Sequence, residues 1–123
     1  VCLINKYSAS DGDLFPWGFR ALGLGKLIGT RTWGGIVGIS GSLPYMDGTG
    51  IRVPFFTSFD PKTGSWIIEN HGVDPDILID NDPVKEWNGE DQQLDRAIQE
   101  VMKELQNRKP LPGVPTPRDF SNN

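Results

Sequence analysis

The chain has 123 residues, which is enough for one domain with a modest core and too few for two. Its formal net charge of −4 comes from 12 basic and 16 acidic residues with no basic cluster, which argues against nucleic acid or an anionic membrane as a partner. No apolar run approaches the roughly 18 residues that a transmembrane helix needs, so we expect no membrane insertion.

A strand, a helix and a second strand are expected at the start of the chain. Residues 1–5 open with an apolar run typical of a buried strand, and residues 11–22 carry apolar side chains at helical spacing. Gly23 stands where a helix C-cap is expected. The short apolar segment at 26–29 would complete a strand–helix–strand unit, in which the two strands run parallel.

The middle of the chain reads as extended segments joined by turns. We expect a strand at 36–39 and a brief last strand at 77–79. Between them, the turn at 60–64 predicts that 51–59 pairs with 65–68 as a β-hairpin.

The clearest helical pattern spans residues 91–107, and its apolar stripe predicts packing in the core. The stripe consists of Leu94, Ile98, Val101, Met102 and Leu105. From residue 109 to 123, four prolines and polar residues predict an extended tail. We therefore divide the chain into a domain at 1–108 and a tail at 109–123.

The turn after the first strand places a serine where acyl-transfer chemistry needs one. Ser10 is the last residue before the predicted helix, and the backbone N–H of Asp11 follows it directly. Free N–H groups at a helix start, together with the positive end of the helix dipole, can stabilise an oxyanion. A serine at this position is also a common helix N-cap, so the residues alone leave both interpretations open.

Three ordered segments, at 5–13, 24–35 and 68–76, resemble the C-terminal-processing (tail-specific) serine peptidases, and most closely their tricorn protease branch. The first of them reads Asn-x-x-Ser-Ala-Ser-Asp-Gly-Asp. The resemblance implies that Ser10 is the nucleophile and that the backbone N–H of Asp11 forms half of the oxyanion hole. It also implies an α/β fold of the crotonase/Clp-protease-like type. This fold is a mixed sheet with ββα units, here incomplete on its N-terminal side.

One departure from the wider family selects the tricorn arrangement. Gly35 stands where the Ser-Lys members carry their lysine base, and glycine cannot accept a proton. In the tricorn branch a histidine and a second serine precede the nucleophile, and a glutamate that matches Glu69 follows it. Read without the family, Glu69 is an ordinary carboxylate at a hairpin end. The histidine and second serine would precede Val1, so we expect this chain to be the C-terminal part of a catalytic domain and inactive alone.

The remaining expectations concern substrate and partners. An extended segment beside the nucleophile can pair with a peptide as an added strand, and the residues expected to do so are Gly34, Gly35, Ile36 and Val37. The resemblance implies a peptide substrate, a homo-oligomer, and an upstream part of the same protease with a PDZ domain and the Ser/His segment. We expect no cofactor and no metal.

Other candidate residues favour ordinary structural roles. His71 is the only histidine, and a structural or solvent-facing imidazole is a safer interpretation than a base for Ser10. The acidic segments at 74–76 and 80–82 lack the ligand spacing and central glycine of a calcium loop. One histidine and one cysteine are too few for a zinc site.

Two other functions remain open from the sequence. One is a crotonase-fold enzyme that binds a coenzyme A thioester, which would use a backbone oxyanion hole without a serine nucleophile. The other is a non-catalytic module for oligomerisation or peptide binding. Covalent labelling of Ser10 in the full-length protein separates the first from a peptidase, and undiminished proteolysis by a Ser10→Ala variant would favour the second.

Overall fold

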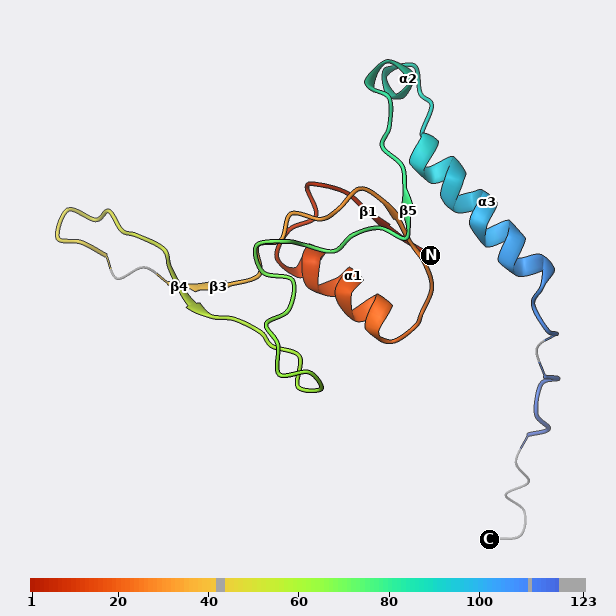
Figure 1. The fold of residues 1–123 in the computed structure, drawn as a ribbon, viewed down its shortest axis with the longest axis horizontal. Coiled ribbons are helices and arrows are strands. Elements are labelled where there is room, and N and C mark those ends of the chain that lie inside the picture. Colours follow the sequence, from red (N-terminus) through yellow and green to blue (C-terminus); the bar gives the residue numbers. More distant parts are fainter. Residues whose placement is uncertain (42–43, 111, 118–123) are drawn as a thin grey trace, which may run out of the picture.

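The computed structural model describes residues 1–41, 44–110 and 112–117 and has mixed α/β architecture (Figure 1). In chain order the elements are β1 (Cys2–Ile4), α1 (Asp11–Ala21), β2 (Leu27–Gly29), β3 (Gly38–Ser40), β4 (Val53–Phe56), β5 (Ile77–Leu78), α2 (Pro83–Trp87) and α3 (Gln92–Gln106). The described tail residues, 109–110 and 112–117, form no helix or strand, and the rest of the predicted tail lies outside the described residues. None of the described helices has the length and apolar character needed to cross a membrane.

A three-stranded parallel sheet in the order β1–β2–β5 organises the N-terminal half. Cys2 pairs with Leu27, which confirms that the strands before and after the first helix are parallel, as predicted. Ile28 pairs with Ile77 and adds β5 to the sheet. α1 packs on β1, and α3 packs on β1 and β2. Because all three strands are parallel, their carboxyl ends meet at one edge of the sheet.

The core is small and lies between this sheet and α1. Ile4, Leu27 and Val73 are buried at its centre. Partly buried side chains pack around them, namely Cys2, Trp17, Phe19 and Ile68. Burial raises the pKa of the Cys2 thiol. A thiol with a raised pKa is a poor nucleophile at neutral pH, so Cys2 acts as a small core side chain.

The second pair of strands differs from the predicted hairpin. Only an isolated bridge, Phe59 with Trp66, joins 51–59 to 65–68, and β4 pairs instead with β3 in an antiparallel ribbon. A side chain at Gly38 would overlap the ring of Phe56, so this glycine allows the ring to cross β3. The ribbon is a separate sheet rather than part of one mixed sheet, and it extends away from the parallel sheet (Figure 1).

α3 begins after Asp91, whose carboxylate caps the N–H of Leu94 at 2.9 Å. The prediction that its apolar stripe packs in the core is wrong for most of the stripe: Leu94, Ile98, Met102 and Leu105 are 45–54% exposed. The buried residues of α3 are Ala97 and Glu100. The helix therefore meets the sheet along a narrower and more polar face than its apolar periodicity indicates.

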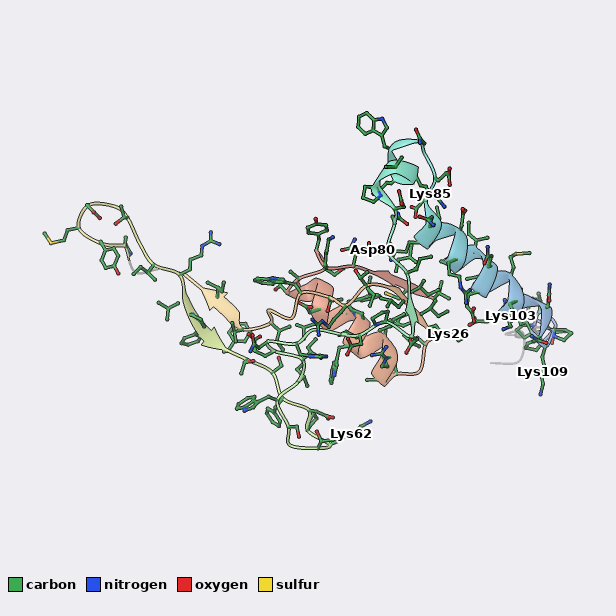
Figure 2. All side chains as sticks on the ribbon, turned by 45° about the horizontal axis from the view of Figure 1, so that its top comes forward. Lys26, Lys62, Asp80, Lys85, Lys103 and Lys109 are labelled. Carbon is green, nitrogen blue, oxygen red and sulfur yellow. The ribbon has the colours of Figure 1, made fainter. Side chains whose placement is uncertain are left out.

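Glu100 attaches the middle of α3 to the sheet. Its side chain is 3% exposed and accepts hydrogen bonds from Lys26, which directly precedes β2, and from Arg96 at 2.9 Å. Lys26 lies beside α3 in Figure 2. The hydrogen bond from Lys26, followed by that from Arg96, holds the pKa of Glu100 below its ordinary value.

This attachment predicts a pH-dependent stability. A carboxylate whose pKa is lowered by folding stabilises the protein above its unfolded pKa of about 4.3, and the contribution is lost as pH falls through the folded pKa. We expect Glu100→Gln to lower the melting temperature at neutral pH, with a difference from wild type that shrinks as the pH falls below about 4. The exposed residue Glu104 on the same helix gives the matched control, Glu104→Gln. Equal melting temperatures for the two variants at neutral pH would contradict the assignment.

Candidate active site

The loop at residues 5–10 joins β1 to α1 and is folded by two polar side chains. Asn5 Oδ1 accepts a hydrogen bond from the N–H of Tyr7 at 2.9 Å, and the N–H of Asn5 donates to Ser8 Oγ at 3.2 Å. The N–H of Ser8 donates back to the Asn5 carbonyl at 2.9 Å. The Asn-x-x-Ser spacing at the start of the motif therefore closes the loop on itself.

Ser10 occupies a backbone conformation that serine rarely adopts. Its φ is 57° and its ψ is −114°, and it is one of two non-glycine residues with positive φ among those described. Such a conformation costs about 1–3 kcal/mol, and a helix cap does not require it because capping residues are normally extended. Strained corners between a strand and a helix are known for projecting a nucleophilic serine. Ser10 is exposed, so this corner is open to solvent.

The next amide is available to a ligand. Within the described part of the chain no acceptor receives the N–H of Asp11, whereas the N–H of Gly12 and that of Asp13 donate to the carbonyls of Ala9 and Ser10 at 2.8 Å each. A backbone N–H at a helix start that no acceptor receives can donate to an oxyanion.

Asp13 holds this corner from behind. Its side chain is completely buried. Oδ2 accepts from the N–H of Ser10 at 2.9 Å and from that of Gly35 at 3.2 Å, while Oδ1 accepts from the N–H of Gly34 at 2.8 Å. One carboxylate thus joins the turn at Ser10 and Asp11, called here the serine corner, to a segment more than 20 residues away. Sequence reasoning missed this role, although an acid three residues after Ser10 is the spacing of a capping box.

Residues 69–73 lie directly on residues 32–35. The N–H of Asn70 donates to the Gly34 carbonyl at 2.6 Å, and that of Val73 donates to Thr32 Oγ1 at 2.8 Å. Both Gly34 and Gly72 have positive φ, and a side chain at either would overlap backbone atoms of the other segment. Two glycines therefore permit the contact that places Glu69.

Glu69 binds the segment predicted to receive substrate. Its Oε2 accepts from the N–H groups of Ile36 and Val37 at 2.7 and 3.0 Å, and Oε1 has no hydrogen-bond partner among the described residues. Four consecutive amides, from 34 to 37, thus donate to the two carboxylates of Asp13 and Glu69. Pairing of residues 34–37 with a peptide as an added strand stays a prediction. Because the N–H groups of these residues already donate to the two carboxylates, the segment would bind a peptide through its carbonyl groups.

Hydrogen bonds therefore link Ser10 to the segment predicted to receive substrate and to Glu69. Asp13 joins the N–H of Ser10 to those of Gly34 and Gly35, and Glu69 binds the next two amides, of Ile36 and Val37. Asp11 takes no part in these bonds and lies beside them only as the residue after Ser10.

His71 lies outside this network. Its Nε2 is 2.8 Å from Asp74 Oδ2, and both side chains are more than half exposed. No hydrogen bond joins His71 to Ser10 in the part of the chain that the structure describes. This arrangement agrees with a solvent-facing imidazole.

Two hollows flank the 5–10 loop. One of about 350 Å³ lies at the carboxyl edge of the parallel sheet and is lined by Asn5, Lys6, Tyr7, Thr30, Asp80, Asn81, Pro83, Glu86 and Gln93. The other, of about 270 Å³, lies between Lys6, Tyr7, Ala9 and Trp33. Lys6 and Tyr7 line both. Ligands of α/β proteins commonly bind at this edge of a parallel sheet. The described residues contain no group of three or more side chains suited to a metal ion.

Comparison with known proteins identifies the family to which this chain belongs. The model of peptidase family S41 matches residues 1–79, and the chain belongs to this family.

Within that family the chain is similar to tricorn proteases. It is 44% identical over 117 residues to the tricorn protease of Thermoplasma acidophilum, covering 94% of this chain and 11% of the relative. It is 43% identical over 108 residues to a putative tricorn-like protease C-terminal subunit of Sulfurisphaera tokodaii, covering 88% and 12%. A crystal structure of tricorn protease matches with a TM-score of 0.76 at 45% identity, covering 85% of this chain and 10% of that one. The chain spans about a tenth of the length of these relatives.

The network around Asp13 predicts a large effect of a nearly isosteric change. In Asp13→Asn an amide N–H₂ replaces one of the two acceptor oxygens and faces backbone N–H donors. We expect a loss of about 1.5–3 kcal/mol in the free energy of unfolding, the range for a hydrogen bond to a charged group. Chemical denaturation measures it, with Asp95→Asn at an exposed position as the control. A loss no larger than that of the control would refute the role of Asp13.

Proposed function

We propose that the intact protein is a serine endopeptidase in which Ser10 attacks the carbonyl carbon of a peptide bond. The strained and exposed corner at Ser10, with the free N–H of Asp11 beside it, is the observation that carries this proposal. Membership of peptidase family S41 supports it.

The proposed reaction is acyl transfer in two steps. Ser10 Oγ bonds to the carbonyl carbon as its proton passes to a histidine base, and the resulting oxyanion accepts a hydrogen bond from the N–H of Asp11. The C–N bond then breaks, and the leaving amine takes the proton from the histidine. Water hydrolyses the acyl-enzyme by the same route and frees Ser10. The segment from Gly34 to Val37 would align the substrate beside the corner.

The histidine base, and the second serine that orients it, would come from polypeptide upstream of this chain. Relatives about ten times longer than the chain support such a source. In this arrangement Oε1 of Glu69, which has no partner among the described residues, would accept a hydrogen bond from the upstream serine and so orient the histidine. We further propose that the intact domain completes a crotonase-like sheet, carries an upstream PDZ domain and forms a homo-oligomer. It would use no cofactor, and this chain alone would be inactive.

Removal of the nucleophile is the direct test. In the full-length protein we expect a fluorophosphonate probe to label Ser10, and we expect Ser10→Ala to lower kcat for a fluorogenic peptide by about ten-thousand-fold or more. Ser65→Ala, at an exposed turn remote from the corner, serves as the control and should keep wild-type activity. Proteolysis undiminished in Ser10→Ala would overturn the proposal, and an unlabelled serine in an active thioester enzyme would favour coenzyme A chemistry.

Glu69 is given two functions, since Oε2 holds the backbone at Ile36 and Val37 and Oε1 would orient the upstream serine. Substitution by glutamine and by alanine should separate the two. In Glu69→Gln the amide oxygen can still accept from Ile36 and Val37, so the segment should stay in place while the charge near the upstream serine is lost. We expect kcat to fall by about 10⁴-fold with little change in melting temperature, because removing the orienting carboxylate of other triads lowers kcat by about this factor. Glu69→Ala should lower both kcat and the melting temperature. Full activity of Glu69→Gln would remove Glu69 from the mechanism.

A further inference from the structure

The first turn of α3 meets the carboxyl ends of β1 and β2 through one side chain. Gln93 Nε2 donates to the carbonyl of Ile4 and to that of Ile28, at 2.8 Å each. The backbone N–H of Gln93 donates to Asn81 Oδ1 at 2.8 Å. The side-chain amide thus uses both of its N–H groups to bridge two neighbouring strands.

The sheet is shaped to admit this amide. Gly29 has a φ of 139°, and a side chain there would overlap both the Ile4 carbonyl oxygen and Gln93 Nε2. The amide therefore occupies space that any other residue at position 29 would fill. Attachment of α3 does not depend on this contact alone, because Glu100 binds Lys26 further along the helix. Gln93 does more than attach α3, because it also binds the end of β1 through the Ile4 carbonyl.

That place is the base of the loop that carries Ser10. Ile4 is the last residue of β1, and its carbonyl also accepts from the N–H of Thr30 at 3.2 Å. Thr30 Oγ1 in turn accepts from the N–H of Lys6 at 3.2 Å. Gln93 and Thr30 thus fix the point at which the chain leaves the sheet toward the serine corner.

We propose that Gln93 is a positioning residue for the nucleophile: by holding the Ile4 and Ile28 carbonyls, it sets where the 5–10 loop stands and thereby the rate at which Ser10 attacks. The inference rests on the proposed function of Ser10. Gln93 acts through the backbone of the loop and touches no reacting atom. A displacement of about 1 Å at a reacting group can slow an enzyme about a hundredfold, so a clamp at the base of the loop is enough to affect kcat.

The test compares Gln93→Glu with Gln93→Ala in the full-length protein. The introduced carboxylate would face two carbonyl oxygens, which disfavours its charged form and raises its pKa above the ordinary value of about 4.3. We expect kcat and the rate of fluorophosphonate labelling to fall about 10- to 100-fold near pH 8, with KM within about twofold of wild type.

Acid should restore part of this loss in one variant only. As the pH is lowered from about 8 to about 5.5, the protonated carboxyl of Gln93→Glu can donate to one carbonyl, and its kcat relative to wild type should rise. Gln93→Ala has nothing to titrate there, so its ratio to wild type should stay constant. Gln99→Glu, on the exposed side of the same helix, is the control and should match wild type throughout.

Backbone hydrogen exchange supplies a readout that does not depend on activity. The N–H groups of Tyr7 and Ser8, which are hydrogen-bonded within the loop, should exchange about tenfold faster in both Gln93 variants than in the control. Unchanged exchange, or wild-type kcat and labelling in both variants, would overturn the positioning role. A loss of activity that follows only the melting temperature would also overturn it. If the wild-type protein is not labelled at all but loop exchange still accelerates, the clamp stands and the peptidase proposal fails.

Discussion

The buried carboxylate of Asp13 is the interaction on which the site depends. A charge removed from water is tolerated only if donors replace its hydration, and three backbone N–H groups do so here. Those donors come from the serine corner and from Gly34 and Gly35. The unusual backbone of Ser10 is thus maintained by the same bonds that satisfy the charge. Neither half of the arrangement would be stable alone, since the strain at Ser10 requires the carboxylate and the carboxylate requires the amides.

Glu69 binds the next residues of the same segment in the same way, as a carboxylate that accepts from backbone N–H groups. The amides of Ile36 and Val37 meet its Oε2 directly after the two that meet Asp13, so the backbone from 34 to 37 lies between two carboxylates. This placement requires residues 69–73 to approach closely, and Gly34 and Gly72 permit the approach. An acidic side chain that fixes backbone through one oxygen keeps the other for a partner. Structure and proposed chemistry therefore use different atoms of Glu69.

The sequence predicts those parts of the fold that local pattern decides. β1, α1 and β2 follow from an apolar run, helical spacing and a capping glycine, each readable within a few residues. Pairing of β4 with β3 depends instead on the space that Gly38 leaves for Phe56, which no local pattern records. The same limit applies to the site. Ser10 is visible in its motif, and Glu69 is visible only through family resemblance. Asp13 and Gln93 act on backbone far away in sequence, and neither position carries a periodic signal for that contact.

The 5–10 loop is held at both ends by helix side chains. This explains how the loop can be exposed to solvent and still keep one conformation. Asp13 of α1 binds it where the helix begins, and Gln93 of α3 binds the carbonyl at which β1 ends. Asn5 and Ser8 close the loop between these points. A strained residue persists only where its surroundings over-determine it, and here they do so from the buried side. The outer side of the corner is thereby left to solvent, so in the proposed reaction a carbonyl carbon would reach the hydroxyl without displacing a hydrogen bond that holds the loop.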